Sequence, residues 1–219
     1  MHVLSVNVGR AEPTEHSDVG VTGINKRPVT GPVAVAAPGV RGVGGSALAG
    51  DRVCDLRNHG GNEQAVYAYA REDLDDWQAR LGRPLVDGSF GENLTTTGMA
   101  VTDALVGERW HIGPDLVLEV CTTRFPCRTF AGWLGEQGWM RTYTQRALPG
   151  AYLRVVSPGE VSAGDEIVVR DRPDHDVTVG VVFRALTLEP DLLPRLLHAD
   201  ALDGKALDRA SRRLARSAT

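Results

Sequence analysis

Apolar side chains recur at every second position in several short segments of the chain. In residues 116–121, Leu116, Leu118 and Val120 fall on one face of an extended strand. Residues 66–69 are rich in valine and tyrosine, which favour strands. We expect extended structure in residues 2–7, 33–35, 66–69 and 116–121, in the strand–turn–strand segment 151–170, and in the apolar run 177–188.

The spacing of apolar residues becomes helical elsewhere. Leu74, Trp77 and Leu81 predict a helix over residues 71–82, because they recur every three or four positions, and Gly82 is a natural stop at its C-terminus. Two further helical regions are expected, a short helix interrupted by glycines in residues 128–140 and two or three short helices beyond Glu189.

Together these segments predict a mainly β fold, with inserted helices and a small helical part at the C-terminus. The 25 glycines and 12 prolines imply many tight turns, which suits a β-rich body. A polar, proline-containing stretch at residues 171–176 predicts a boundary. We therefore expect one domain over residues 1–172 and a C-terminal helical extension over residues 173–219.

Charge and hydropathy narrow the functional class. The formal net charge of −4 argues against a general nucleic-acid surface, which would need a basic excess. No apolar run approaches the roughly 20 residues that a membrane span requires. The first ten residues, MHVLSVNVGR, lack the pattern of a signal peptide. These features predict a cytoplasmic protein whose three cysteines stay reduced.

Cys127 is the first candidate for chemistry. It follows Pro126 on a connection beyond a strong strand pattern, where functional groups often lie, and it is flanked by Arg124 and Arg128. Nearby cations stabilise the thiolate, which is the form that attacks or binds metals. A packed hydrophobic role is equally compatible with these residues alone. Cys121 and Cys54 lie in apolar surroundings, and we expect both to be packed.

Three other short motifs combine polar side chains with glycine or proline. In RNHGGNEQ, His59 precedes two glycines, and the segment predicts either an anion-binding nest or an ordinary exposed turn. In GINKRPVTG, a basic pair suits a phosphate clamp or a solvated turn. In FGENLTT, a Glu-Asn pair suits a heterocycle contact or a turn cap. The residues of interest are His59, Gly60, Gly61, Lys26, Arg27, Glu92 and Asn93.

Taken in order, seven segments resemble one family. KRPVTGPV, LAGDRVCDLRNHGG, AVYAYAREDLDDW, GSFGENLTTTG, VGERWHIG, RFPC and GAYLRVVSPGEVSAGD are similar to the motifs of MOSC-domain proteins, most of all to the stand-alone bacterial YiiM-like type. The similarity runs from about residue 23 to residue 170. Two features depart from the family pattern: the stretch from Pro38 to Asp51 is longer than in many relatives, and Phe125 occupies a position that is variable or small in some of them, which would affect access to Cys127.

This resemblance implies a MOSC-type β-barrel over residues 1–172 that binds the molybdenum cofactor, a pterin that carries molybdenum. By the same resemblance, Cys127 is the metal ligand, and we assign His59 to proton delivery. The implied cofactor contacts are Lys26, Arg27, Gly60, Gly61, Glu92, Asn93 and Arg124. The family resemblance also suggests pyridoxal phosphate binding.

The implied activity is the reduction of small N-hydroxylated bases and related compounds to amines. We find no flavin, haem or iron–sulfur motif, so the electrons are expected from a separate reductase. A homodimer is compatible with the sequence. Two alternatives stay open: a sulfur or cofactor carrier that uses a Cys127 persulfide, and a non-catalytic ligand-binding module. The carrier normally accompanies a cysteine-desulfurase domain, for which 219 residues leave no room, so we rank the enzyme first.

Overall fold

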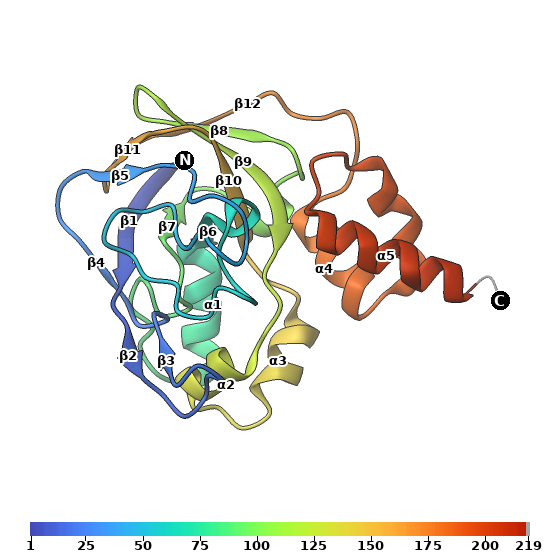
Figure 1. The fold of residues 1–219 in the computed structure, drawn as a ribbon, viewed down its shortest axis with the longest axis horizontal. Coiled ribbons are helices and arrows are strands. Elements are labelled where there is room, and N and C mark those ends of the chain that lie inside the picture. Colours follow the sequence, from blue (N-terminus) through green and yellow to red (C-terminus); the bar gives the residue numbers. More distant parts are fainter. Residues whose placement is uncertain (218–219) are drawn as a thin grey trace.

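The computed structural model describes residues 1–217 and is built around a mixed eight-stranded sheet (Figure 1). In spatial order, its strands are β12 (Ile167–Arg170), β8 (Arg109–Ile112), β9 (Leu116–Thr123), β10 (Ala151–Ser157), β6 (Val66–Ala70), β7 (Leu94–Thr97), β1 (His2–Gly9) and β4 (Lys26–Pro28). Only the β6–β7 pair of this sheet is parallel. Two small antiparallel pairs accompany it, β5 (Val33–Val35) with β11 (Gly159–Val161) and β2 (Glu12–Pro13) with β3 (Val21–Thr22).

The predicted β-barrel is not confirmed, because the sheet order ends at β12 and β4 without a closing ladder. The sheet is nevertheless strongly curved. Near the start of β1, Val3 accepts a hydrogen bond from the Gly164 N–H at 2.8 Å and donates one to the Asp165 carbonyl at 2.9 Å. An isolated bridge also pairs His2 with Glu166. The segment just before β12 therefore lies against β1, and the inner face of the sheet holds an aliphatic core.

The expected helix over residues 71–82 is present as α1 (Arg71–Leu81), with Gly82 in the left-handed region at its C-terminus. The glycine-interrupted segment forms two helices, α2 (Arg128–Leu134) and α3 (Trp139–Arg146). These helices enclose a second, aromatic core below the sheet. Its fully buried rings include Tyr69, Trp77, Phe90, Phe130, Trp139, Tyr143 and Phe183. Short 3₁₀ turns form η1 (Asn62–Gln64) and η2 (Val101–Asp103).

The strand predicted over residues 177–188 is wrong, because this run forms the helix α4 (Val179–Thr187). The Thr178 hydroxyl caps the helix by accepting a hydrogen bond from the Val181 N–H at 3.1 Å. Almost every residue of α4 is buried, so no polar face imposes a helical period on the sequence. The β-branched residues therefore gave a strand-like pattern in a helix that is covered on nearly all sides.

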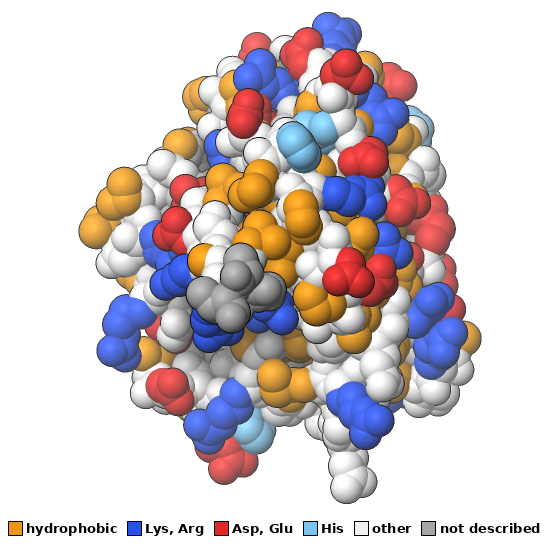
Figure 2. Space-filling view, turned by 90° about the vertical axis from the view of Figure 1, so that its right-hand side faces the viewer, with side chains coloured by type: hydrophobic (Ala, Val, Ile, Leu, Met, Phe, Trp, Pro, Cys, Tyr) orange, Lys and Arg blue, Asp and Glu red, His pale blue; other side chains and the backbone are white. Residues whose placement is uncertain are grey.

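The C-terminal helices α4, η3 (Pro190–His198) and α5 (Gly204–Ser217) project from one side of the sheet (Figure 1). Their own apolar cluster includes Leu186, Leu193 and Leu196. A helical C-terminal part was expected from the sequence. The domain boundary at residue 172 stays a prediction, and residues 218–219 of the predicted extension lie outside the described residues. Figure 2 views this side of the molecule and shows apolar side chains bordered by basic and acidic ones. Within residues 1–217, no helix combines the length and apolar character required to cross a membrane.

Candidate functional site

A pocket opens where β4, β6 and the end of β9 meet the loop that spans residues 51–60. Its empty space is about 710 Å³, including the part open to solvent, and this volume accommodates a cofactor-sized ligand. Six of the residues singled out in the sequence line it: Lys26, His59, Gly60, Asn93, Arg124 and Cys127. Arg27, Gly61 and Glu92 lie outside the lining. The fold thus brings together side chains that are up to 101 positions apart, between Lys26 and Cys127.

Cys127 is half-buried at the residue that precedes α2, immediately after β9 and its connection. Burial by itself would raise the pKa of this thiol. A hydrogen bond from the His59 imidazole, the Arg124 guanidinium and the Phe130 backbone N–H oppose that effect, and the pKa falls to about 7. About half of the thiol is therefore ionised at neutral pH, which suits a nucleophile or a ligand for a soft metal.

Arg124 supplies a fixed positive charge behind this sulfur. Its guanidinium is 4.0 Å from the centre of the Phe130 ring and 5.0 Å from that of Tyr67. One of its nitrogens donates a hydrogen bond to the Phe90 carbonyl. Because Arg124 is only 7% exposed, these aromatic faces hold its charge near the inner wall of the pocket. Arg128, by contrast, is exposed and pairs with Asp18.

His59 and Gly60 line the pocket beside Cys127, and Gly61 follows them outside the lining. Gly60 and Gly61 have φ angles of +78° and +79°, a region that favours glycine. A Cβ on Gly60 would lie 2.8 Å from the Gly45 carbonyl oxygen. The Gly61 N–H already donates to that same carbonyl at 3.2 Å, so it is not available to an anion. The glycines thus allow two loops to pack closely, and of the pair only Gly60 reaches the pocket.

Lys26, Asp51 and Asn93 form a polar network at the base of the pocket. The Lys26 ammonium forms an ion pair with Asp51, whose side chain is fully buried. The other oxygen of Asp51 accepts a hydrogen bond from the Asn93 amide at 2.9 Å. Burial lowers the pKa of Lys26, although Asp51 opposes this effect. The charge of Lys26 is therefore largely committed to Asp51, while Arg27 points outward from β4 as an exposed residue.

Glu92 lies behind the pocket and fixes one of its walls. Its carboxylate accepts hydrogen bonds from the Phe90 N–H at 2.9 Å and from the Thr95 hydroxyl at 3.0 Å, as well as from the N–H of Gly88. Burial raises the pKa of Glu92 to about 7. The turn that contains Gly88 and Phe90 places the Phe90 carbonyl against Arg124. Glu92 therefore stabilises the turn that holds Arg124 in place at the pocket wall.

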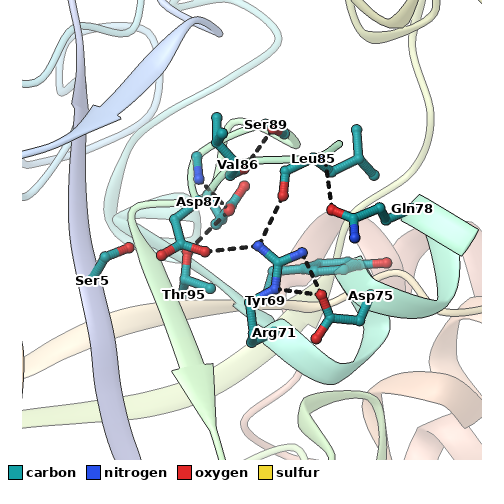
Figure 3. Close-up of polar contacts among 12 residues, drawn as sticks. Ser5, Tyr69, Arg71, Asp75, Gln78, Leu85, Val86, Asp87, Ser89 and Thr95 are labelled. Carbon is teal, nitrogen blue, oxygen red and sulfur yellow. Dashed lines mark hydrogen bonds and ion pairs between the residues drawn. The ribbon is translucent and has the colours of Figure 1, made fainter. Parts of the chain in front are cut away.

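A second network holds the same turn against α1 (Figure 3). Arg71 donates to the Leu85 carbonyl and to the Asp87 carboxylate, both at 2.9 Å. The side-chain amide oxygen (Oε1) of Gln78 accepts a hydrogen bond from the Leu85 N–H at 3.0 Å. The wall that carries Phe90 and Gly91 is thereby anchored to a helix.

Several pocket residues were not identified from the sequence as candidates. Asp51 was noted only as part of a long loop, and Cys54 was expected to be packed, although it is half-buried and lines the pocket. Arg52 is exposed and also lines it. Gln64 contributes a buried carbonyl oxygen that has no hydrogen-bond partner among residues 1–217. The signal that could have pointed to Asp51 is its place in the segment LAGDRVCDLRNHGG, which also contains His59.

The donor atoms suit a metal that arrives with ligands of its own. Within residues 1–217, no group of three or more His, Cys, Asp and Glu side chains is arranged to hold a metal ion. The pocket instead offers the single thiolate of Cys127, nearby cations and the unsatisfied oxygen of Gln64. Such a set fits a metal already held by an anionic organic cofactor, to which the protein adds one sulfur ligand.

Comparisons with known proteins show the family to which the chain belongs. A family model described as the MOSC domain matches residues 55–168. The chain is 32% identical to "Uncharacterized protein YflK" of Bacillus subtilis over 178 residues, which covers 81% of this chain and 76% of that protein. It is 30% identical over 219 residues to a protein of Gibberella moniliformis named "Reductase", which covers 97% of this chain but only 37% of that longer protein.

The fold is likewise similar to solved structures. The crystal structure of YiiM from Geobacillus stearothermophilus superposes with a TM-score of 0.78 at 25% sequence identity, covering 97% of this chain and 98% of that one. The agreement extends over the C-terminal helices as well as the sheet, because nearly all of both chains is covered.

Proposed function

Because the chain belongs to the MOSC domain family, we propose that it binds a molybdenum cofactor and reduces small N-hydroxylated bases and related compounds to amines. The family is associated with molybdenum cofactor binding and reductase-like function. The name of the fungal relative supports an oxidoreductase, although this chain spans only about a third of that protein. The particular substrate class and the role of Cys127 are part of the proposal.

One observation carries the assignment of the ligand. Cys127 lines the pocket and is half-buried, yet its neighbours lower its pKa to about 7. A free cysteine that served only to fill space would have its pKa raised by the same burial. Thiolate is the form that binds a high-valent metal, so the surroundings of Cys127 favour the proposed bond.

The rest of the pocket provides contacts that a pterin and its phosphate need. The unpartnered Gln64 oxygen can accept a hydrogen bond from an amino group on a heterocycle. For the phosphate, we assign Arg52 at the exposed edge together with Arg124 at the inner wall, since Arg forms strong paired contacts with phosphate oxygens. Lys26 is a weaker contact because it is already paired with Asp51, and Arg27 would have to act from outside the pocket.

His59 is the proposed proton donor. Its side chain lines the pocket and hydrogen-bonds to the Cys127 sulfur, so a proton on the imidazole lies beside the reacting region. The cofactor, when bound, supplies the two-electron redox chemistry, and the protein orients the substrate and delivers protons. Converting an N-hydroxyl group to an amine consumes two electrons and two protons and releases water. A separate reductase is the proposed source of those electrons.

Other expectations keep the status of predictions. These are a homodimer, a cytoplasmic location, pyridoxal phosphate binding and the absence of nucleic-acid partners. The carrier alternative would place a persulfide on Cys127 without requiring molybdenum, so it enters the test below as an outcome.

The test is to produce the protein in cells that make the cofactor and to measure molybdenum per chain together with turnover of a hydroxylaminopurine. A chemical reductant replaces the unknown electron donor. We expect a near-stoichiometric metal content in the unmodified protein and at least a tenfold loss in Cys127→Ser. Cys121→Ser is the matched control, because Cys121 lies six positions away but is fully buried outside the pocket.

The outcomes separate the three candidate functions. Molybdenum retained in Cys127→Ser would refute the proposed ligand. Cyanide-releasable sulfur without molybdenum would instead favour the carrier. A protein that binds neither under these conditions would favour the non-catalytic module.

A further inference from the structure

Phe125 lies between the candidate site and the C-terminal helices. It belongs to the RFPC motif, two residues before Cys127, yet it lies outside the pocket lining. Its ring stacks on the ring of Phe183 in α4, with centroids 5.6 Å apart and planes inclined by 17°. Phe183 itself is fully buried in the aromatic core. The side chain that was expected to affect access to Cys127 is therefore directed toward α4.

A residue of α5 contacts the same ring. The Arg209 guanidinium lies 5.2 Å from the centre of the Phe125 ring. The same side chain donates a hydrogen bond to the Leu186 carbonyl of α4 at 3.2 Å. Phe125 is thus held by a buried ring from one helix and by a cation that is itself fixed to the end of that helix.

The backbone of RFPC sends neighbouring side chains in different directions. Arg124 packs against Phe130 and Tyr67 on the site side, whereas Phe125 packs against the C-terminal helices. Pro126 then restricts the backbone φ angle, and Cys127 returns to the pocket. A displacement of Phe125 would therefore be transmitted through one stiff residue to the sulfur.

Other contacts fix the C-terminal helices to the strands that support this motif. The Asp203 N–H, just before α5, donates to the Cys121 carbonyl of β9 at 2.9 Å. Arg154 of β10 donates to the Ala201 carbonyl at 2.7 Å. The helices are thereby anchored to the same pair of strands that leads into the site, so they provide a fixed reference for Phe125.

We propose that Phe125 is a positioning residue through which α4 and α5 hold the Cys127 sulfur beside His59 and Arg124. This assigns a role in the site to the C-terminal helices, which contribute no residue to the pocket lining within the described chain. Measurements of bound molybdenum and of turnover test this role only if the proposed function is right. Measurements of the reactivity of the Cys127 sulfur and of hydrogen exchange in its backbone do not depend on the proposed function.

The experiment compares Phe125→Leu and Arg209→Ala with two matched variants. Phe125→Tyr keeps an aromatic ring for stacking, and Arg212→Ala removes an exposed arginine one helical turn from Arg209 that bonds only within α5. The rate at which iodoacetamide modifies Cys127 at pH 7 is followed by mass spectrometry of its peptide. Hydrogen exchange at residues 124–131 and the melting temperature are measured on the same samples.

We expect Phe125→Leu and Arg209→Ala to slow modification of Cys127 threefold or more, because the sulfur leaves His59 and Arg124, and to speed exchange at residues 124–131. Phe125→Tyr and Arg212→Ala should match the unmodified protein within a factor of about 1.5. If all four variants give the same rate, or if the first two react faster, the positioning role is wrong.

Metal content and turnover then separate this inference from the proposed function. If the unmodified protein binds no molybdenum, the cofactor proposal fails while the reactivity and exchange data still decide the role of Phe125. If it binds molybdenum, Phe125→Leu should lower kcat more than it raises KM for the hydroxylaminopurine.

Discussion

Cys127 and Cys121 lie six residues apart, on the same strand and its continuation, yet they occupy opposite chemical environments. Cys121 is fully buried within β9, and its thiol donates to the Glu63 carbonyl at 3.0 Å. Burial raises its pKa to about 12. Cys127 lies beyond the strand, facing a pocket, with a pKa of about 7 because cationic and N–H groups stabilise its thiolate.

The difference between the two cysteines shows what makes a thiol reactive. Burial is the largest influence on the pKa of both thiols, but Cys121 is fully buried whereas Cys127 is half-buried and opens onto the pocket. Arg124 and His59 lower the pKa of Cys127, whereas at Cys121 complete burial outweighs the opposing effect of the Arg154 guanidinium, and the thiol donates to the Glu63 carbonyl. The reactivity of each thiol therefore depends on how deeply it is buried and on whether the surrounding charges and hydrogen bonds offset that burial.

The largest expected effect is the difference in alkylation rate between the two thiols in the folded protein. At pH 7, about half of Cys127 and only about one Cys121 in 10⁵ would be ionised. Iodoacetamide should therefore modify Cys127 at least about a thousandfold faster than Cys121. Peptide mass spectrometry measures both rates in one sample. In denaturant, the two rates should converge, and comparable rates in the native protein would abolish the contrast.

The next effect concerns the cation behind Cys127. Arg124→Ala removes two cation–π contacts and leaves the Phe90 carbonyl without its donor, so we expect the free energy of unfolding to fall by about 3 kcal/mol. The pKa of Cys127 should rise toward its ordinary value. Arg124→Lys keeps the positive charge, so the pKa of Cys127 should stay low. The free energy of unfolding should still fall, because lysine cannot reproduce the contacts of the planar guanidinium. Urea titrations and the pH dependence of alkylation measure the two effects, and an unchanged Cys127 pKa in Arg124→Ala would contradict the assigned role.

Much of the secondary structure could be predicted from the sequence, because the spacing of apolar residues reflects which side chains are buried. Alternating apolar residues predicted β9, and apolar residues at helical spacing, followed by a glycine, predicted α1. The prediction failed at α4, where burial on nearly all sides removed the polar face that distinguishes a helix. The short β2–β3 pair was also missed, because two-residue strands leave no periodic pattern.

The candidate site could be anticipated in part. Cys127 and His59 stand in recognisable motifs, and the fold places both at one pocket. The pairing of Lys26 with Asp51 could not be anticipated, since it joins segments 25 residues apart. Nor could the sequence show that Lys26 points inward and Arg27 outward, because that depends on how β4 pairs with β1, where Arg27 lies opposite Val8.

The third expected effect concerns Glu92, the buried acid that stabilises the turn in contact with Arg124. The folded state raises the pKa of Glu92 from 4.5 to about 7, so it binds this proton more tightly than the unfolded chain does. The free energy of unfolding should therefore fall as the pH rises from about 4.5 to about 7. Between pH 5 and pH 8, we expect the unmodified protein to lose about 2 kcal/mol more than Glu92→Gln does. Urea titrations across this range provide the measurement, and parallel pH profiles for the two proteins would show that Glu92 is ionised throughout.

The smallest effect is expected from substitution of Cys121, the fully buried cysteine. Cys121→Ser keeps a donor for the Glu63 carbonyl but places a more polar group in a fully buried position, so the free energy of unfolding should fall by about 1 kcal/mol. Molybdenum content and the alkylation rate of Cys127 should stay unchanged, because Cys121 lies outside the pocket. Cys121→Ala is the useful companion, since it leaves the carbonyl without this donor and removes buried volume, and it should cost more than serine does. If either variant abolished metal binding while the protein still melted cooperatively, the functional thiol would have been assigned to the wrong cysteine.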